Sequence, residues 1–347
     1  MNTPKVRLGD VSVGFVRSLA SAVTAHGHDP QPMLKQYGFD EARLGEPRAR
    51  LSIARYMRLG HSAIQLTQNP ALGLSMGKLS RFNQLGLAGI TAAQAPTVRE
   101  AARTLIRFEL LYAFNYRGSA SFREDKDGAW LRFYSISPYN AYNRFVIDSV
   151  LASWISQLSA LADESLTPEK IEVEYSVPSY SEAYHSHFRC PIEFGASCNQ
   201  LRLNQHSLNK RNPSHCPSTW RELLDLCEKD LATRTRTRSL SEQIALILGP
   251  LLNQREPDLT EIAQRLKIPS WTLRRKLAEE GTQYREILNN TRRDLALIYI
   301  KDTDLAFGEI AYVLGYASAE AFQRAFKRWT GHTPGEWRRS QRFTAEL

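Results

Sequence analysis

Side chains that can recognise nucleic-acid bases recur on two short segments in the last third of the chain. The first segment carries Trp271, Arg274 and Arg275, and the second carries Gln323 and Arg324. Arginine can donate two hydrogen bonds to guanine, glutamine can pair with adenine, and tryptophan can cover a thymine methyl group. For these side chains to act together, the surrounding sequence has to form elements that present them on one surface.

The two segments belong to one pattern that occurs twice. Its copies start at Glu261 and Glu309, which are 48 positions apart, and both continue with isoleucine and alanine. Apolar residues then recur at helical spacing, with a turn in the middle of each copy. Pro269 and Gly315 lie in these turns, where a helix is expected to stop.

Each copy predicts a helix, a tight turn and a second helix. Ala263 and Ala311 are small enough for two helix backbones to cross closely. Ser270 and Ser318 are expected to cap the second helices, because a serine hydroxyl accepts from otherwise unpaired amides. This is the helix-turn-helix signature, whose second helix enters a DNA major groove. A plain α-helical hairpin is the alternative, and the second copy counts against it.

The closing run resembles the C-terminal signature of the AraC/XylS family of bacterial transcription regulators. That run reads Gly315-Tyr316-x-Ser318-x-x-x-Phe322-x-Arg324-Ala325-Phe326-Lys327-Arg328-Trp329-x-Gly331-x-x-Pro334-x-x-Trp337-Arg338. The resemblance, together with the outward spacing of the side chains, predicts the DNA contacts. They are Ser270, Trp271, Thr272, Arg274, Arg275, Ser318, Glu320, Gln323, Arg324, Lys327 and Arg328.

Some of these residues have a second interpretation. Arg275 either contacts DNA or forms an ion pair within its domain, since structural arginines outnumber base-reading ones. Lys327 and Arg328 are expected to contact phosphate or to lie on a solvated face. The helix at about 284–301 should join the two motifs, at about 259–280 and 307–329, so that both reach successive major grooves.

An α+β domain is predicted before the all-α DNA-binding domain. Helical patterns dominate up to Tyr112. They include a first amphipathic helix at 11–26 and a helix from Ser52 to Thr67. Strands are then predicted at 113–122 and 129–135, followed by a long helix at 141–162. We assign residues 1–232 to this domain, 233–239 to a basic linker and 240–347 to the DNA-binding domain.

The first domain resembles, more loosely, the sensor domain of the regulator subfamily related to ornithine-responsive regulators and VirS. The matching residues include His28-Asp29-Pro30 and Cys190-Pro191-Ile192. An aromatic cluster there either packs a core or lines an effector pocket with arginines that bind an acidic group. The candidate pocket residues are Arg107, Tyr112, Arg117, Arg132 and Tyr134.

Composition bounds the remaining possibilities. The net charge of +9 favours a polyanionic partner, although residues 235–347 hold only 18 Lys and Arg against 14 Asp and Glu. We expect a cytoplasmic protein, because no apolar run approaches the ~18 residues of a membrane-spanning helix and no signal peptide is apparent. His185, His187 and Cys190 are metal-ligand types at spacings that match no standard zinc set. We therefore predict no cofactor.

The sequence therefore predicts an effector-responsive transcription activator. The family resemblance implies a homodimer that binds double-stranded DNA, senses an unknown small molecule and acts on RNA polymerase, away from membranes. One alternative is an enzyme, such as an alkyl-accepting repair domain, fused to the same DNA-binding domain. Another is a dimeric DNA-binding protein that senses nothing. We identify no nucleophile elbow or phosphate loop in support of an enzyme.

Overall fold

The computed structural model describes residues 9–115, 118–135, 139–235, 239–252, 255–302 and 305–345. The chain divides into two compact units, one formed by Gly9–Asn115 with Ser119–Arg234 and one that includes Thr235–Leu347. We call them the sensor unit and the DNA-binding unit. Helix α12 (Pro217–Thr235) continues into the segment predicted as a linker, so Thr233 and Arg234 are helical.

The sensor unit begins with the mostly helical part that the sequence predicts. Ser52 caps α4 as expected, since its hydroxyl accepts from the Arg55 amide at 3.4 Å. Gly38 follows α2 with a φ of 73°, in the left-handed region. The helices are α1 (Val13–Ala25), α2 (Gln31–Gln36), α3 (Glu41–Gly45), α4 (Ile53–Thr67), α5 (Leu72–Leu79), η1 (Phe82–Leu85), α6 (Gly86–Ala93), α7 (Val98–Arg107) and α8 (Glu109–Tyr112).

A small antiparallel sheet within this helical part was not predicted. Strand β1 (Gly9–Ser12) pairs with β2 (Arg50–Ser52) on one side and with β3 (Ala113–Asn115) on the other. The predicted first helix at 11–26 is therefore wrong at its start, because Val11 and Ser12 are extended. Strands of three or four residues are too short to show the alternation that identifies a strand.

The predicted strand at 113–122 is also wrong as a single element. Its first part, β3, belongs to the small sheet, whereas β4 (Ser121–Glu124) pairs with β5 (Gly128–Phe133) in a second sheet. The alternation of apolar residues continues through both strands, so the sequence pattern gives no sign of the change of sheet.

The second sheet has five strands in the order β4-β5-β8-β6-β7. Strands β8 (Asn199–Asn204) and β6 (Lys170–Val173) pair antiparallel, and only β6 and β7 (Ile192–Phe194) are parallel among these named strands. The predicted hairpin joins β4 to β5, with Asp125 accepting from the Gly128 amide at 3.0 Å. Ala129 and Leu131 of β5 point into the core, and Trp130 alternates to the other face.

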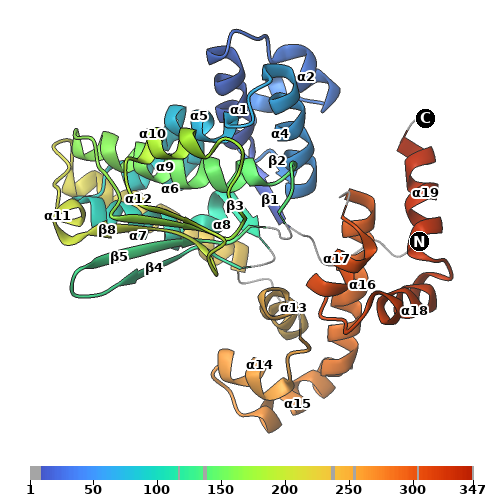
Figure 1. The fold of residues 1–347 in the computed structure, drawn as a ribbon. Helices are drawn as coiled ribbons and strands as arrows, with labels where there is room; N and C mark the ends of the chain where they lie inside the picture. Colours follow the sequence, from blue (N-terminus) through green and yellow to red (C-terminus); the bar gives the residue numbers. More distant parts are fainter. Residues whose placement is uncertain are drawn as a thin grey trace. The chain divides into compact units, whose positions relative to one another are not determined.

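The long helix α9 (Arg144–Ala162) lies over this sheet and is the centre of the core (Figure 1). Glycines of α5 let the two helices approach closely, because a Cβ at Gly73 would lie 2.6 Å from the Phe145 carbonyl oxygen. By length and composition α9 could cross a membrane, which the sequence analysis did not anticipate. Most of it is buried, as expected for the core helix of a folded domain.

The remaining elements complete both units. The sensor unit adds α10 (Ser181–Phe188), α11 (Gln205–Leu208) and α12. The described residues of the DNA-binding unit form only helices: α13 (Leu240–Leu251), α14 (Leu259–Arg265), α15 (Ser270–Glu279), α16 (Tyr284–Asp302), α17 (Phe307–Val313), α18 (Ala319–Thr330) and α19 (Pro334–Ala345).

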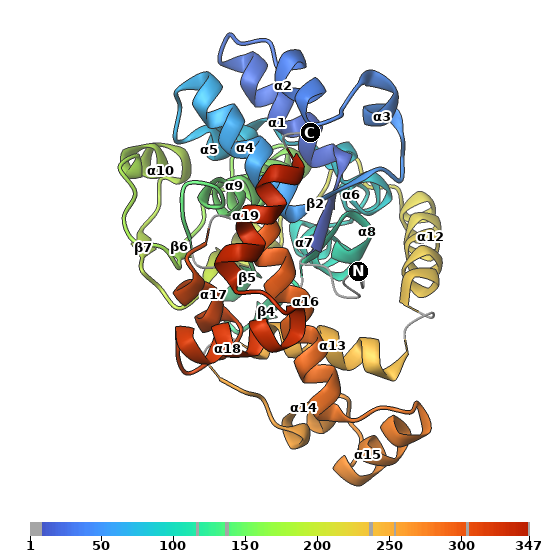
Figure 2. The ribbon, with the colours of Figure 1, turned by 90° about the vertical axis from the view of Figure 1, so that its right-hand side faces the viewer.

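The repeated pattern forms two helix pairs, α14 with α15 and α17 with α18, which Figure 2 shows near the two ends of α16. Both turns have the same hydrogen bonding. The Ile268 amide donates to the Ala263 carbonyl at 3.1 Å, and the Tyr316 amide donates to the Ala311 carbonyl at 2.9 Å. The preceding residue is left-handed in both, with φ values of 56° at Lys267 and 71° at Gly315.

The second helices start differently. Ser318 caps α18 as predicted, with its hydroxyl accepting from the Ala321 amide at 3.2 Å. Ser270 does not cap α15, because the helix begins one residue earlier, with Pro269 at the capping position and Ser270 inside the first turn. Proline at 269 fixes the backbone before α15 without the help of a side-chain cap.

The two left-handed turn residues should respond oppositely to substitution. A Cβ at Gly315 would lie 2.4 Å from the Arg255 carbonyl oxygen and 2.6 Å from that of Leu252. Gly315→Ala should therefore lower the free energy of unfolding by about 2–4 kcal/mol, from backbone strain and steric conflict together. Lys267→Gly should raise it by about 0.5–1 kcal/mol by relieving strain.

Urea unfolding of the full-length chain, with a signal from the DNA-binding unit, measures the change in the free energy of unfolding for both variants. Gly281→Ala is the matched control, because Gly281 has a φ of 72° but nothing within 4 Å of its missing Cβ. It reports backbone strain without steric conflict. If Gly315→Ala cost no more than Gly281→Ala, the close approach to Arg255 would not contribute to stability.

Candidate functional site

Helix α15 presents a free surface with the predicted side chains on it. Leu273 and Leu277 are fully buried against the rest of the unit, as predicted. Trp271, which follows the first residue of the helix, is 67% exposed, an unusual position for so large an apolar side chain. Arg274 is exposed as well, while Ser270 and Thr272 are half-buried at the same end.

The two arginines of α15 differ in their surroundings. Arg275 lies 5.9 Å from the centre of the Trp271 ring and 3.6 Å from the Glu279 carboxylate. This is the intradomain pairing that the sequence analysis left open, but an exposed pair of this spacing is worth only about 0.3–0.5 kcal/mol. Arg274 forms no ion pair or hydrogen bond with any other described residue. Its five donors are therefore available to an external acceptor.

Helix α18 presents the second surface. Phe322 and Phe326 are fully buried, as predicted, and they contact each other with ring centres 5.9 Å apart. The Ser318 hydroxyl lowers the pKa of the Glu320 carboxyl, which therefore stays ionised. All the other predicted side chains of α18 are exposed: Glu320, Gln323, Arg324, Lys327 and Arg328.

A buried arginine that the sequence analysis missed holds the second motif in place. Arg292 of α16 donates to the Leu314 carbonyl at 2.9 Å and to the Gly315 carbonyl at 3.0 Å. Its guanidinium also pairs with Glu256 at 2.8 Å and stacks on the Tyr316 ring at 4.8 Å. The turn of the second motif is thus attached directly to α16.

A signal for this arginine was present in the sequence. The buried stripe of α16 includes Leu288, Leu295 and Tyr299, and Arg292 occupies the helical position between the first two. A charged residue in an apolar stripe has to be paired, because a buried charge without partners is costly. The partners themselves follow from the fold and not from the spacing.

The segment before α14 connects both motifs. Arg255 makes two hydrogen bonds to the Glu261 carboxylate, at 2.7 and 2.8 Å, at the start of α14. Glu256 pairs with Arg292, as described above. Helix α16, at 1.5 Å per residue, is about 28 Å long, somewhat less than the ~34 Å between successive major grooves.

The predicted effector residues that the structure describes do not converge on one pocket. Arg107 pairs with Glu228 at the surface, and Arg132 donates to Gln200 at 3.3 Å across the five-stranded sheet, with Tyr134 beside it. Tyr112 is buried, and its hydroxyl donates to the Leu105 carbonyl at 3.0 Å. Arg117 lies outside the described residues. The sequence grouped these residues by type, whereas the fold distributes them over separate surfaces.

Tyr112 instead lines a cavity together with an acidic residue that the sequence analysis did not single out. Glu109 is only 7% exposed, and burial raises the pKa of its carboxyl to about 7. The Ala120 amide donates to it at 2.7 Å. Buried acids with strongly shifted pKa values are frequent at functional sites.

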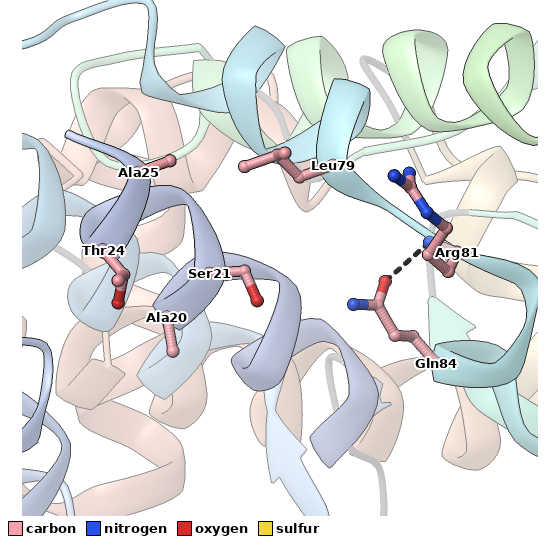
Figure 3. A pocket seen from close by; sticks show the side chains of 7 residues that line it. All are labelled: Ala20, Ser21, Thr24, Ala25, Leu79, Arg81 and Gln84. Atoms are coloured by element: carbon pink, nitrogen blue, oxygen red, sulfur yellow. Dashed lines mark hydrogen bonds between the residues drawn. The ribbon is translucent and has the colours of Figure 1, made fainter.

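A larger groove of about 590 Å³ opens on the surface of the same unit. Figure 3 shows that α1 lines one side of it with Ser21 and Thr24, and that Leu79, Arg81 and Gln84 line the other side. Arg81 is its only charged lining residue. The Arg81 amide donates to the Gln84 side chain at 2.8 Å, which orders this edge.

The candidate metal ligands lie apart from one another. Within the described ranges, no three His, Cys, Asp or Glu side chains come close enough to hold a metal ion. Burial lowers the pKa of His187 to about 4 and raises the pKa of the Cys190 thiol to about 11. Both side chains are thereby neutral at physiological pH.

Family models match both units. The model described as the arabinose-binding domain of AraC transcription regulator, N-terminal, matches residues 27–212. A helix-turn-helix domain model matches residues 262–340, from within α14 through the second helix pair. These matches confirm the resemblance, and the α+β and helical architecture, that the sequence predicts.

Individual relatives extend over nearly the whole chain. The ornithine utilization regulator of Pseudomonas aeruginosa is 27% identical over 94% of this chain and 96% of its own length. The transcriptional regulator VirS of Mycobacterium tuberculosis is 22% identical over 90% of this chain and 91% of its own length. The solved structure of the regulator CdpR from P. aeruginosa is 23% identical, with a TM-score of 0.45 over 94% of this chain and 98% of that chain.

The contacts of Arg292 predict how the DNA-binding unit responds to its loss. Arg292→Met keeps the helix and much of the side-chain volume but leaves the carbonyls of Leu314 and Gly315 without these donors. We expect the free energy of unfolding to fall by about 3 kcal/mol. Calorimetry of the full-length chain measures the change, with Arg285→Met, an exposed substitution on the same helix, as the control. Equal stabilities of the two variants would contradict this role.

The burial of Glu109 predicts a dependence of stability on pH. The pKa of its carboxyl is higher in the folded than in the unfolded chain, so the folded state binds the extra proton between about pH 4.5 and 7. Within this window stability should fall by about 1.4 kcal/mol for each unit of rising pH. Glu109→Gln should remove that contribution.

The measurement compares urea unfolding of the wild type and Glu109→Gln at several pH values. Asp148, whose pKa burial raises to about 6, titrates in the same window and is unchanged in both proteins. The difference between the two profiles therefore isolates Glu109. Parallel profiles would show that this carboxyl titrates as it does in water.

Proposed function

The chain belongs to the AraC family of transcription regulators, and on that premise we propose that it is an effector-responsive activator that binds two successive major grooves. That it is a DNA-binding transcription regulator with two helix-turn-helix motifs follows from its family. The grooves, the contacting residues and the response to an effector are our proposal. The main support for the proposed DNA contacts is Arg274, which lies on the exposed face of α15 and has no partner among the described residues.

We assign the base contacts first to α15. Arg274 would donate to guanine, and the exposed Trp271 ring would cover a thymine methyl group or a sugar. Arg275 would exchange its weak pairing with Glu279 for a base or a phosphate. On α18, Gln323 would pair with adenine and Glu320 would accept from cytosine, while Lys327 and Arg328 would contact phosphates.

The sensor unit would bind a small-molecule effector and shift the protein between two states. In this proposal the chain is a cytoplasmic homodimer without enzymatic activity, and its active state recruits RNA polymerase. The family description of the sensor unit as a ligand-binding domain supports the effector. The relatives that share both units are transcription regulators, which supports the absence of an enzymatic reaction.

Selection of bound duplexes from a random pool tests the DNA-binding part. The full-length protein should enrich a site with two boxes about one helical turn apart. Arg274→Ala should weaken binding to that site by about 10- to 100-fold and relax the preference at one base pair, as expected for one bidentate contact. Binding to unrelated DNA should change much less.

Arg339→Ala is the matched control, because it removes the same charge from an exposed position on α19. It should lower affinity for all sequences slightly and leave the preferred site unchanged. If both variants weakened specific and non-specific binding equally, Arg274 would contact phosphate and not a base. Sequence-independent binding, with and without a small-molecule cell extract, would rule out the proposed two-groove recognition.

A further inference from the structure

The cavity beside Glu109 lies where α1, α5, α8, β5 and α9 meet. Its volume of about 40 Å³ is enough for one or two water molecules. Aromatic side chains form much of its wall. Three serines also line it: Ser18 of α1, Ser80 directly after α5, and Ser153 of α9. The residues that matter for the argument are Phe15, Glu109, Tyr112, Phe133, Trp154 and Gln157.

Two hydrogen-bond acceptors in this cavity are incompletely satisfied. Among the described residues, no Arg, Lys or His forms an ion pair with Glu109, and the Ala120 amide is its one hydrogen-bond donor. Gln157 is 1% exposed, and its amide nitrogen donates to the Ser80 hydroxyl at 3.0 Å. Its carbonyl oxygen, Oε1, has no partner in the described part of the chain.

Such groups are costly to bury alone. An unpaired acceptor loses its hydrogen bonds to water, and a carboxylate without a counter-ion loses far more. A ligand that brings both hydrogen-bond donors and positive charge would remove both costs. The aromatic rings of Phe15, Tyr112 and Trp154 suit the same charge, because ring faces attract cations.

We propose that this cavity is the effector site and that its ligand is a small organic cation with a primary ammonium group. The assignment rests on the effector response proposed above and names its ligand class. The ammonium group would donate to the Glu109 carboxylate and to Gln157 Oε1, and its carbon chain would lie against the aromatic wall. The cavity has to enlarge, by rotation of side chains, to hold more than the ammonium group.

In this proposal the ligand enters from the surface groove of Figure 3. Adjacent residues alternate between the two spaces: Leu79 and Arg81 line the groove, while Ser80 lines the cavity. Gln84 lines the groove and accepts at 2.7 Å from the hydroxyl of Ser18, which lines the cavity. The groove and the cavity are therefore lined by neighbouring residues and joined by one side-chain hydrogen bond.

The contacts of α8 connect the cavity to the helix that leads into the second unit. Tyr112 lines the cavity, and with Phe108 and Leu111 it packs in one cluster with Cys227 of α12. Cys227 is also hydrogen-bonded to Thr91 at 3.2 Å. Helix α12 ends at Thr235, where the DNA-binding unit begins. Enlarging the cavity would therefore displace α8 against α12, the last element of the sensor unit.

Binding of straight-chain amines to the full-length protein tests the proposal. The probes are methylammonium, n-butylammonium and 1,4-diaminobutane chlorides, with n-butanol, butyrate and sodium chloride at matched concentration as comparisons. At pH 8 we expect at least one amine to raise the melting temperature by several degrees, while the alcohol, the carboxylate and the salt do not. Glu109→Gln should weaken amine binding at least tenfold.

Two controls separate the site from a general charge effect. Glu228→Gln removes an acid that pairs with Arg107 at the surface, away from the cavity, and should leave amine binding unchanged. Gln157→Met removes the second acceptor and should weaken binding while keeping the fold. In the wild type, affinity should fall about tenfold for each pH unit below about 7, as the Glu109 carboxyl is protonated.

Several outcomes would overturn the assignment. They are the absence of any amine-specific stabilisation, equal stabilisation by amine and alcohol, and amine binding that persists in Glu109→Gln. A separate measurement of DNA binding with a small-molecule cell extract distinguishes the two levels of the proposal. If the extract alters DNA binding equally in wild type and Glu109→Gln, the effector response stands and this site is wrong. If no extract alters it, the effector response itself fails.

Discussion

The burial of one charged side chain determines how the DNA-binding unit is assembled. Arg292 lies in the apolar stripe of α16 and is 5% exposed, so its guanidinium has to find acceptors within the protein. It finds them in the turn between α17 and α18, at the carbonyls of Leu314 and Gly315, and in Glu256 before α14. One side chain therefore links the central helix to the turn of the second helix pair and to the segment that leads into the first. The separation and orientation of α15 and α18, on which recognition of two grooves depends, are consequently properties of α16 and not of either motif alone.

The sensor unit contains the opposite situation, a buried charge that the described fold does not pair. Among the described residues, Glu109 has one donor and Gln157 Oε1 has none, in a cavity lined by aromatic rings and three serines. A protein can tolerate the free-energy cost of a poorly satisfied buried acceptor at a ligand site. A ligand that donates to the acceptor removes this cost, and its binding is strengthened accordingly. Asp148 shows that the same domain can satisfy a buried acid, since Tyr180 donates to it at 2.8 Å and Tyr184 at 2.5 Å. Asp148 has side-chain donors and Glu109 has none among the described residues. This contrast supports Glu109 as part of a ligand site.

Sequence reasoning was accurate where structure depends on local spacing. The helices of the two motifs, their buried leucines and phenylalanines, and the exposure of Trp271 and Arg274 all follow from a helical period applied to a repeated pattern. It was wrong where position relative to distant elements decides. Ser270 was expected to cap α15, but Pro269 already sets the backbone there. The stretch 113–122 alternates like one strand, although β3 pairs with β1 and β4 pairs with β5. Strand partners are long-range choices that alternation within one segment cannot record.

The same distinction explains why the predicted effector residues lie on separate elements while the predicted DNA contacts share helix faces. A recognition helix carries its chemistry on one face of a single segment, so residue type and period locate it. A ligand cavity in an α+β domain is assembled from several segments, here α1, α5, α8, β5 and α9. Grouping Arg107, Arg132 and Tyr112 by type overlooked that the first two point to surfaces outside this cavity. Glu109 belongs to a four-residue helix in which an acid at the first position is ordinary. Packing against other segments of the chain buries that acid, and no described side chain forms an ion pair with it.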